Sequence, residues 1–272
     1  MPKEIEAQIL FINYDDIIEK LKKYNAKQKF DWVKFRIAVF NPCLSINEQK
    51  EKYDMIFTRV RDEGLGKITI TTKTKSKTVN DEKFVNEYEI ETTNSFEESM
   101  NLLKANHLSM KAYQERLRQK WIIPGRPEIK EIVFDIWPGL PMHMEVEADT
   151  EKNLEKFLIE LDIDIKNIKY SGASKFYNEI LGVELDKINN NTPILDFKSV
   201  KTELEQSVNN KEKFYEILKD QEKQLKRFGF ESLIGGRKLI SKKQSKKQSK
   251  KQSKKQSKKS SKKQNKKQSK KS

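Results

Sequence analysis

The chain has 272 residues, and 56 lysines and arginines against 41 aspartates and glutamates give it a formal net charge of +15. One cysteine excludes an intramolecular disulfide, and two histidines argue against a histidine-rich metal site or a Ser-His-Asp triad. The charge is unevenly spread. Residues 241–272 are Ser-Lys-Lys-Gln repeats with 16 lysines and no acidic residue, whereas residues 1–240 carry 40 basic and 41 acidic side chains.

The sequence carries no membrane-spanning or secretory signal. No apolar run approaches the roughly 18 residues that a membrane span needs, and the first 20 residues contain several acidic side chains. We therefore expect an intracellular, cytoplasmic protein that is not secreted and has no transmembrane segment. The sequence does not indicate an oligomeric state.

The lysine repeats at residues 241–272 contain no apolar residue to bury, which predicts a disordered tail. Its lysines would bind nucleic-acid phosphates or another anionic surface without sequence preference, which also fits a nuclear or nucleic-acid-associated location. The alternative is a tolerated repeat expansion with no selected role.

In chain order, period-two alternation of polar and apolar residues predicts strands at residues 4–10, 57–61, 67–73, 84–91, 112–122, 129–136 and 143–147. Apolar residues at helical spacing predict helices between them, at residues 15–24, 95–108, 150–161 and 174–181. Ser95 and Glu98 form a capping-box pattern at the start of the second helix. The predicted fold class is α+β.

The last quarter of the chain reads differently. Residues 186–195 predict a linker, and residues 196–240 predict a helical appendage that Asn209 and Asn210 break into two helices. The predicted domains are therefore residues 1–185, the linker, the appendage, and the tail at 241–272.

The predicted strands carry rows of like charge on one face, because residues i and i+2 of a strand point to the same side. Acidic rows occur at Glu4 and Glu6, at Glu87, Glu89 and Glu91, and at Glu145 and Glu147. Cationic rows occur at Arg59 and Arg61, at Lys73 and Lys75, and at Arg116, Arg118 and Lys120.

An antiparallel sheet with one solvated face gives the same alternation. Like charges side by side are unfavourable, however, unless a counter-ion or a ligand lies between them. Acidic rows would bind divalent cations, and cationic rows would bind phosphates. A sheet rolled into a barrel with these rows inward would form a polar tunnel suited to a polyphosphate with Mg²⁺ or Mn²⁺.

The order of these motifs is specific. The chain shows E-x-E at Glu4–Glu6, R-x-R at Arg59–Arg61, E-x-E at Glu87–Glu89, and D-x-W-P-G-L at 135–140 before E-x-E at Glu145–Glu147. Over residues 3–182 this pattern resembles the CYTH superfamily, the triphosphate tunnel metalloenzymes. The resemblance implies an eight-stranded antiparallel β-barrel tunnel with surrounding helices.

The resemblance also implies a hydrolase that uses Mg²⁺ or Mn²⁺ and acts on inorganic tripolyphosphate, thiamine triphosphate or a nucleoside triphosphate. The catalytic carboxylates that it implies are Glu4, Glu6, Glu87 and Glu89. The substrate-binding cations would be Arg59, Arg61, Lys73, Arg116, Arg118, Lys120 and Lys175. The metal ligands would be Glu4, Glu6, Asp135, Glu145 and Glu147.

One residue departs from the family pattern. The lysine that follows the first E-x-E in the family is Gln8 here, which donates hydrogen bonds but brings no charge, so phosphate binding should weaken. The competing functions are a class IV-type adenylate cyclase, an RNA 5′-triphosphatase, which the basic tail favours, and a catalytically weakened protein that binds polyphosphate or nucleic acid. His143 is expected at the rim of the tunnel, and Trp137 is expected to pack outside it.

Overall fold

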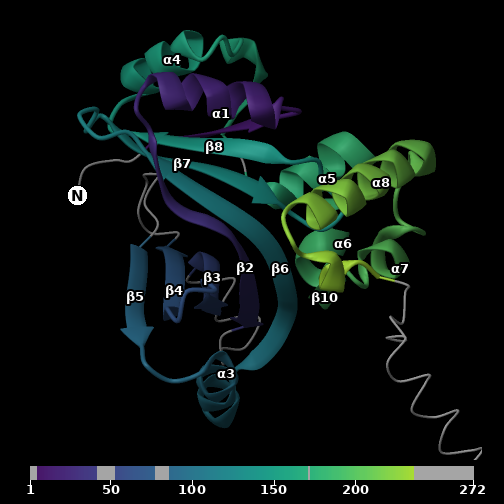
Figure 1. Cartoon of the computed structure of the whole chain (residues 1–272). Helices are drawn as coiled ribbons and strands as arrows, with labels where there is room; N and C mark the ends of the chain where they lie inside the picture. The colour runs from purple at the N-terminus through teal and green to yellow at the C-terminus, as the bar shows by residue number, and fades with distance from the viewer. Residues whose placement is uncertain (1–4, 42–52, 77–85, 171, 236–272) are drawn as a thin grey trace, which may run out of the picture. The chain divides into compact units, whose positions relative to one another are not determined.

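The computed structural model describes residues 5–41, 53–76, 86–170 and 172–235 (Figure 1). The predicted tail at 241–272 and the predicted site residue Glu4 lie outside these ranges, as does the side chain of Lys75. None of the described helices combines the length and apolar character needed to cross a membrane.

A single large sheet organises residues 5–195. Its strands are β1 (Ile5–Leu10), β2 (Lys27–Asn41), β3 (Tyr53–Asp62), β4 (Ile68–Ser76), β5 (Asn86–Thr92), β6 (Ser109–Ile122), β7 (Ile129–Ile136), β8 (His143–Ala148), β9 (Ile168–Lys169) and β10 (Ile194–Leu195). The order across the sheet is β5-β4-β3-β2-β6-β7-β8-β1-β9, all antiparallel, and β10 adds a short parallel pairing to β6. The predicted α+β class is confirmed, with ten described strands instead of eight.

The sheet is strongly curved. The long strands β2 and β6 pair over most of their length, and their register shifts between Gln28 and Val33 and again at Phe40. Such bulges bend a strand and increase its twist, and Figure 1 shows both strands arching across the molecule. The path ends at β5 and β9, and within the described residues no pairing joins these two edges. The predicted closure into a barrel is therefore not shown.

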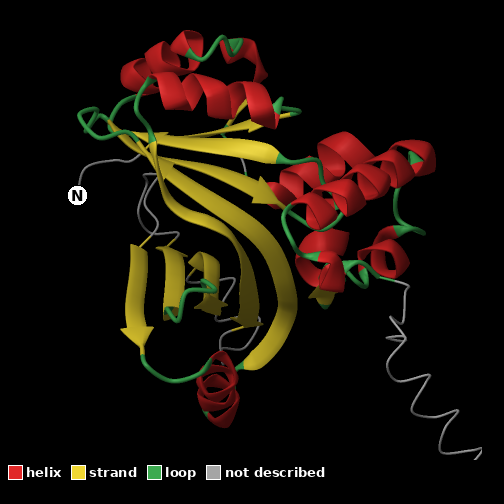
Figure 2. Cartoon of the chain, in the orientation of Figure 1, coloured by secondary structure: helices red, strands yellow, loops and turns green. Residues whose placement is uncertain are grey.

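Helices cover the outer face of the sheet (Figure 2). Helices α1 (Tyr14–Lys23) and α4 (Glu151–Glu160) cover β1, β7 and β8 and bury the largest apolar core with them. Helix α3 (Phe96–Ala105) covers β3 and β4 around Phe96 and Val60. The capping box that the sequence predicts is confirmed, because the Ser95 hydroxyl accepts from the Glu98 amide and the Glu98 carboxylate accepts from the Ser95 amide.

The C-terminal helices form a second core. These are α5 (Ala173–Leu181), α6 (Leu185–Asn190), α7 (Val200–Leu204) and α8 (Lys211–Arg227), with short 3₁₀ turns at Ile165–Asn167 and Glu231–Leu233. They bury Leu140, from the turn between β7 and β8, together with Phe176, Tyr177 and Phe214. The predicted break in the appendage is confirmed, since Asn210 caps the start of α8. Residues 186–195, predicted as a linker, contain most of α6 and all of β10.

Candidate functional site

The concave face of the sheet lines a cavity of about 760 Å³. Its walls come from β1, β3 to β8 and the start of α5. The lining residues are Glu6, Gln8, Arg59, Arg61, Lys73, Glu87, Glu89, Arg116, Arg118, Glu131, Asp135, Trp137, His143, Glu145, Glu147, Gly172 and Ala173. Because β5 and β1 lie near opposite ends of the sheet, a cavity lined by both requires the sheet to curl around it.

The alternation that the sequence predicts accounts for this lining. On β1, Glu6 and Gln8 face the cavity, and Ala7 and Ile9 between and beside them are buried in the core under α1 and α4. The other strands follow the same pattern, with apolar residues on the outer side of each charged row, including Val60, Ile68, Leu117, Met144 and Val146. The predicted separation into a charged face and an apolar face is confirmed.

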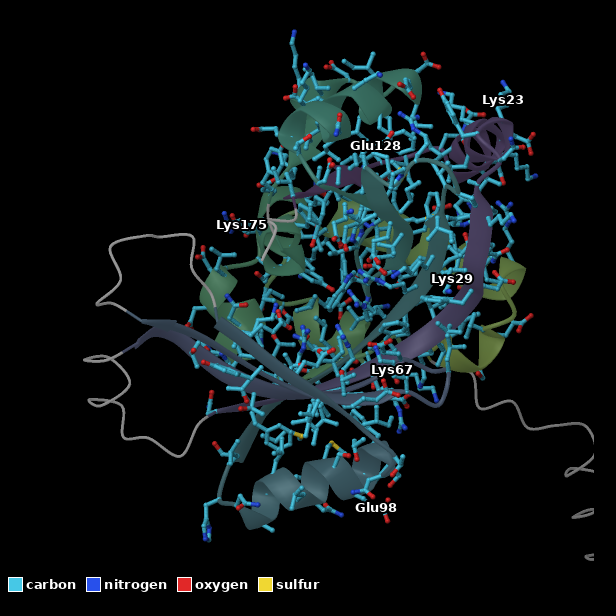
Figure 3. The ribbon with its side chains drawn as sticks, turned by 90° about the vertical axis from the view of Figure 1, so that its left-hand side faces the viewer. Lys23, Lys29, Lys67, Glu98, Glu128 and Lys175 are labelled. Atoms are coloured by element: carbon cyan, nitrogen blue, oxygen red, sulfur yellow. The ribbon has the colours of Figure 1, made fainter. Side chains whose placement is uncertain are left out.

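Eleven of the predicted site residues meet at the cavity, and their roles stay predictions. They are Glu6, Arg59, Arg61, Lys73, Glu87, Glu89, Arg116, Arg118, Asp135, Glu145 and Glu147. Two others do not line it. Lys120 forms an ion pair with Glu131. Lys175 is exposed on α5, where Figure 3 shows it at the outside of the molecule.

The centre of the site is a buried ion-pair network on β6, β7 and β8. The Arg118 guanidinium donates from Nε to Asp135 Oδ1 (2.8 Å) and from Nη2 to Asp135 Oδ2 (2.6 Å). Its Nη2 also reaches Glu145 Oε2 at 3.3 Å. Burial alone would raise the pKa of Asp135, but Arg118 and Arg116 outweigh it and hold that pKa well below its usual range. Asp135 therefore stays ionised, and the two arginines balance its negative charge.

Arg116 lies beside this network with fewer partners. Its Nη1 is 3.3 Å from Asp135 Oδ2, and its Nε has no hydrogen-bond partner. The guanidinium carbon is 5.0 Å from the Phe35 ring centroid and 5.5 Å from the Trp137 ring centroid, so two aromatic rings hold it. Burial and the neighbouring Arg118 lower the pKa of Arg116 to about 10. The Arg116 guanidinium therefore stays charged at neutral pH, and its Nε–H is available to donate a hydrogen bond to a ligand.

The cations of β3 and β4 are held by carboxylates of β5, and Arg61 is also held by Glu63 at 2.9 Å. Lys73 Nζ is 2.7 Å from Glu87 Oε2, and Arg59 and Arg61 reach Glu87 and Glu89 at 3.5 and 3.4 Å. The Thr71 hydroxyl also donates to Glu89 at 2.7 Å. Burial raises the pKa of Glu89, but this hydrogen bond and the nearby arginines lower it overall. Both carboxylates occupy the positions at which oxygens of an anionic ligand would bind these cations.

The sequence did not place Glu131, His143 and Trp137 of the lining correctly, and it did not indicate Gly172 or Ala173. Glu131 is on the same face as Asp135 by period two, so its alternation would have revealed it. The prediction that Gln8 donates hydrogen bonds is confirmed, because its Nε2 donates to Glu6 (3.0 Å) and Glu145 (3.4 Å).

His143 was placed wrongly, and the position of Trp137 was predicted only in part. His143 is 1% exposed and lies edge-on to Phe176 of α5, so it is not at a rim. Burial lowers its pKa, which favours the neutral ring. Trp137 packs against the C-terminal core outside the sheet, as predicted, but it also lines the cavity. Both positions depend on the C-terminal helices, whose placement the sequence did not reveal.

Several solved structures are similar to this chain. A protein of Pyrococcus horikoshii matches at 17% identity and a TM-score of 0.48, over 64% of this chain and 99% of its own. A proposed adenylate cyclase of Vibrio parahaemolyticus matches at 12% identity and a TM-score of 0.48, over 64% and 97%. A proposed adenylyl cyclase of Hippeastrum, described as having a dominant triphosphatase activity, matches at 14% and 0.42, over 64% and 93%.

No protein-family model matches the sequence, and no curated protein does.

The CYTH resemblance implies a divalent metal, and the chemistry of the donors beside Gln8 fits one. Glu6, Glu145 and Glu147 supply carboxylate oxygens from the neighbouring strands β1 and β8, and hard cations such as Mg²⁺ prefer oxygen ligands. The buried Gln8 Oε1 has no hydrogen-bond partner. Within the described residues, no three acidic, histidine or cysteine side chains are gathered at one point as they stand. Asp135, a predicted ligand, is bound instead by Arg116 and Arg118.

Glu145 predicts a pH dependence of stability in the metal-free protein. Burial, together with Asp135 and Glu6, raises its pKa from the ordinary 4.5 to about 8, although Arg118 opposes this. The folded state then holds a proton that the unfolded state releases. Its contribution to stability is complete below the ordinary pKa and is lost as pH rises through about 8.

We expect the unfolding free energy of EDTA-treated wild type, measured in urea, to fall relative to that of Glu145→Gln between about pH 5 and pH 8. Comparing the two proteins cancels the opposite effect of His143. A constant difference across this range would show that Glu145 is ionised throughout.

Proposed function

We propose that the protein is a divalent-metal-dependent hydrolase of triphosphates, which bind in the charged cavity. The observation that carries the proposal is the lining itself. Five cationic side chains and several carboxylates share one cavity, and Gln8, Arg59, Arg61 and Arg116 each keep a buried polar atom without a hydrogen-bond partner. Buried polar groups in folded proteins are nearly always paired, so these groups are suited to a polyanionic ligand with a cation.

The cations would bind the phosphate chain by exchanging partners. A triphosphate carries a charge of about −4, and charge-assisted hydrogen bonds from arginine to phosphate oxygens are strong and directional. Phosphate oxygens would replace Glu87 and Glu89 at Arg59, Arg61 and Lys73. Arg116, whose Nε is unpartnered, would bind a further phosphate group. Arg118 stays with Asp135 and lends positive charge to the same wall.

Hydrolysis then needs no protein nucleophile, because positioning and charge neutralisation supply most of the catalysis of phosphoryl transfer. Glu6, Glu145 and Glu147 would hold the cation, with the Gln8 oxygen beside them. Bound Mg²⁺ or Mn²⁺ neutralises the charge that develops on phosphate oxygens. Glu87 and Glu89, once released from the cations, would orient the attacking water and accept its proton. We propose that the sheet closes into a tunnel in the complex, with its edge strands β5 and β9 completing the wall around the ligand.

The test is phosphate release from tripolyphosphate, thiamine triphosphate and ATP, with Mg²⁺ or Mn²⁺ supplied or removed by EDTA. We expect metal-dependent release from at least one substrate and its loss in a Glu6→Ala/Glu147→Ala variant. Product analysis with ATP separates hydrolysis, which gives ADP and phosphate, from cyclisation, which gives cyclic AMP and pyrophosphate. If wild type is no faster than the double variant on every substrate, the hydrolase proposal is wrong.

Restoring the family's lysine gives a sharper prediction about substrate binding. In Gln8→Lys, an ammonium group would lie between Glu6 and Glu145 and face the cavity, so we expect KM for tripolyphosphate to fall about tenfold. Steady-state kinetics at saturating metal measure this change. Gln8→Leu is the control, since it removes the amide without adding charge and should not lower KM. An unchanged KM in Gln8→Lys would mean that Glu6 and Glu145 form ion pairs with the new ammonium group and keep it from the substrate.

A further inference from the structure

The C-terminal helix α8 contacts the site through one buried side chain, Gln221. Its Nε2 donates to the carbonyl oxygens of Trp137 (2.8 Å) and Leu140 (3.1 Å), and its Oε1 accepts from the amide of Gly139 (3.1 Å). Gln221 is 4% exposed. A single side chain therefore satisfies three backbone groups of the turn that joins β7 to β8.

This turn has little room to move on its other sides. Gly139 has a φ of +77°, and a Cβ atom there would lie 2.9 Å from Val200 of α7 and 3.1 Å from Phe214 of α8. The Tyr177 hydroxyl of α5 donates to the Pro138 carbonyl oxygen at 2.5 Å. The turn is thus clamped between three C-terminal helices, and Gln221 provides most of the hydrogen bonds.

The same turn carries Trp137, whose indole ring lines the cavity. The Trp137 ring centroid lies 5.5 Å from the Arg116 guanidinium carbon, and among the described residues Arg116 forms one ion pair, the 3.3 Å contact to Asp135. Contacts with the Trp137 and Phe35 rings therefore largely determine the orientation of the Arg116 side chain. A shift of the turn would move Trp137 and leave Arg116 free to adopt other rotamers.

We propose that Gln221 is a positioning residue for ligand binding, which fixes the turn so that Trp137 directs Arg116 into the cavity. This rests on the proposed function only in taking a triphosphate as the ligand. It assigns a role to the C-terminal appendage: α8 acts as a brace for the phosphate-binding wall from outside the sheet.

The test is a double-mutant cycle on tripolyphosphate binding, measured by titration calorimetry with EDTA present so that no turnover occurs. We expect Gln221→Met, which keeps the volume but loses all three hydrogen bonds, to weaken binding about tenfold. In an Arg116→Met background the same substitution should change affinity less than about twofold, because the group through which it acts is gone. Hydrogen exchange should rise in the peptide containing Gly139.

The matched control is Gln224→Met, one turn along α8, because Gln224 hydrogen-bonds only to Asp220 of the same helix. It should leave affinity within about twofold. If Gln221→Met does not fold, Gln221→Glu replaces it, since it keeps the acceptor for Gly139 but loses both donors.

Equal losses in the two backgrounds would overturn the proposal, as would unchanged affinity in Gln221→Met or failure of wild type to bind tripolyphosphate. Coupling in binding without hydrolysis of any triphosphate would sustain the role of Gln221 and refute the proposed function. Hydrolysis without coupling between Gln221 and Arg116 would support the proposed function and refute the role of Gln221.

Discussion

Replacing Arg59 and Arg61 together by alanine is expected to lower kcat/KM for the preferred triphosphate about a thousandfold, the scale of arginine contributions to phosphoryl transfer. Both side chains line the cavity, and both have a buried Nε without a hydrogen-bond partner. Their removal deletes two phosphate donors. It also leaves Glu87 and Glu89 with fewer cationic partners, so they would repel the incoming substrate.

Steady-state kinetics at saturating metal give the effect, with thermal unfolding as a check that the variant is folded. Arg126→Ala is the matched control, because Arg126 pairs with Glu128 and Glu160 and does not line the cavity. The Arg59→Lys/Arg61→Lys variant keeps the charge but loses the planar fork and should fall between the two. A loss smaller than about tenfold in the alanine variant would contradict phosphate binding at this wall.

Replacing Asp135 by alanine is expected to lower the free energy of unfolding by about 3–5 kcal/mol, the usual cost of removing one partner of a buried ion pair. Asp135 is 1% exposed and accepts hydrogen bonds from both Arg116 and Arg118. Without it, two buried guanidinium groups of like charge lie side by side, and Glu145 remains as a more distant acceptor for Arg118.

Urea unfolding at neutral pH measures the loss. Asp15→Ala is the control, because Asp15 pairs with Arg227 in an exposed ion pair, which should contribute almost nothing. A loss for Asp135→Ala no larger than that of the control would show that water in the cavity solvates the arginines fully. Added tripolyphosphate should restore part of the lost stability, since the arginines then regain an anionic partner.

The charged rows were predictable because the side-chain period of a strand is two, whatever the curvature of the sheet. Glu6, Arg118 and Glu145 line the cavity for this reason, and the apolar residues beside them are buried. This two-residue period determines which face a charged side chain lies on, but not how far along the strand the charged residues still reach the cavity. Lys120 shares the face of Arg118 but lies about 7 Å further along the strand, where it pairs with Glu131.

Strand β2 was not predicted, although it is the longest of the described strands and joins the two halves of the sheet. Its register with β6 shifts twice between Gln28 and Val33, so apolar and polar residues do not alternate regularly there. A bulge places consecutive residues opposite a single partner and breaks the period on which the prediction depends. The curvature of the sheet, which creates the cavity, comes from the same irregularity.

The positions of residues that are fixed by contacts with distant parts of the chain could not be predicted from the sequence. Lys175 was assigned by resemblance, yet on α5 its neighbours Phe176 and Tyr177 take the buried face and leave it exposed. His143 is buried because Phe176 covers it. Trp137 faces the cavity on a turn that Gln221 binds from a helix more than 80 residues later. No local pattern encodes these contacts.

The pairing of β1 with β8 constrains when the cavity can form during synthesis. Glu6 pairs with Glu147 and Gln8 with Glu145, so the first strand has no partner until residues 143–148 have left the ribosome. Until then, its apolar residues Ala7 and Ile9 lack the core that later buries them. Contacts between distant parts of a chain slow folding. The acidic wall that β1 and β8 form is therefore assembled late, after the arginine-bearing strands β3 and β6 have emerged.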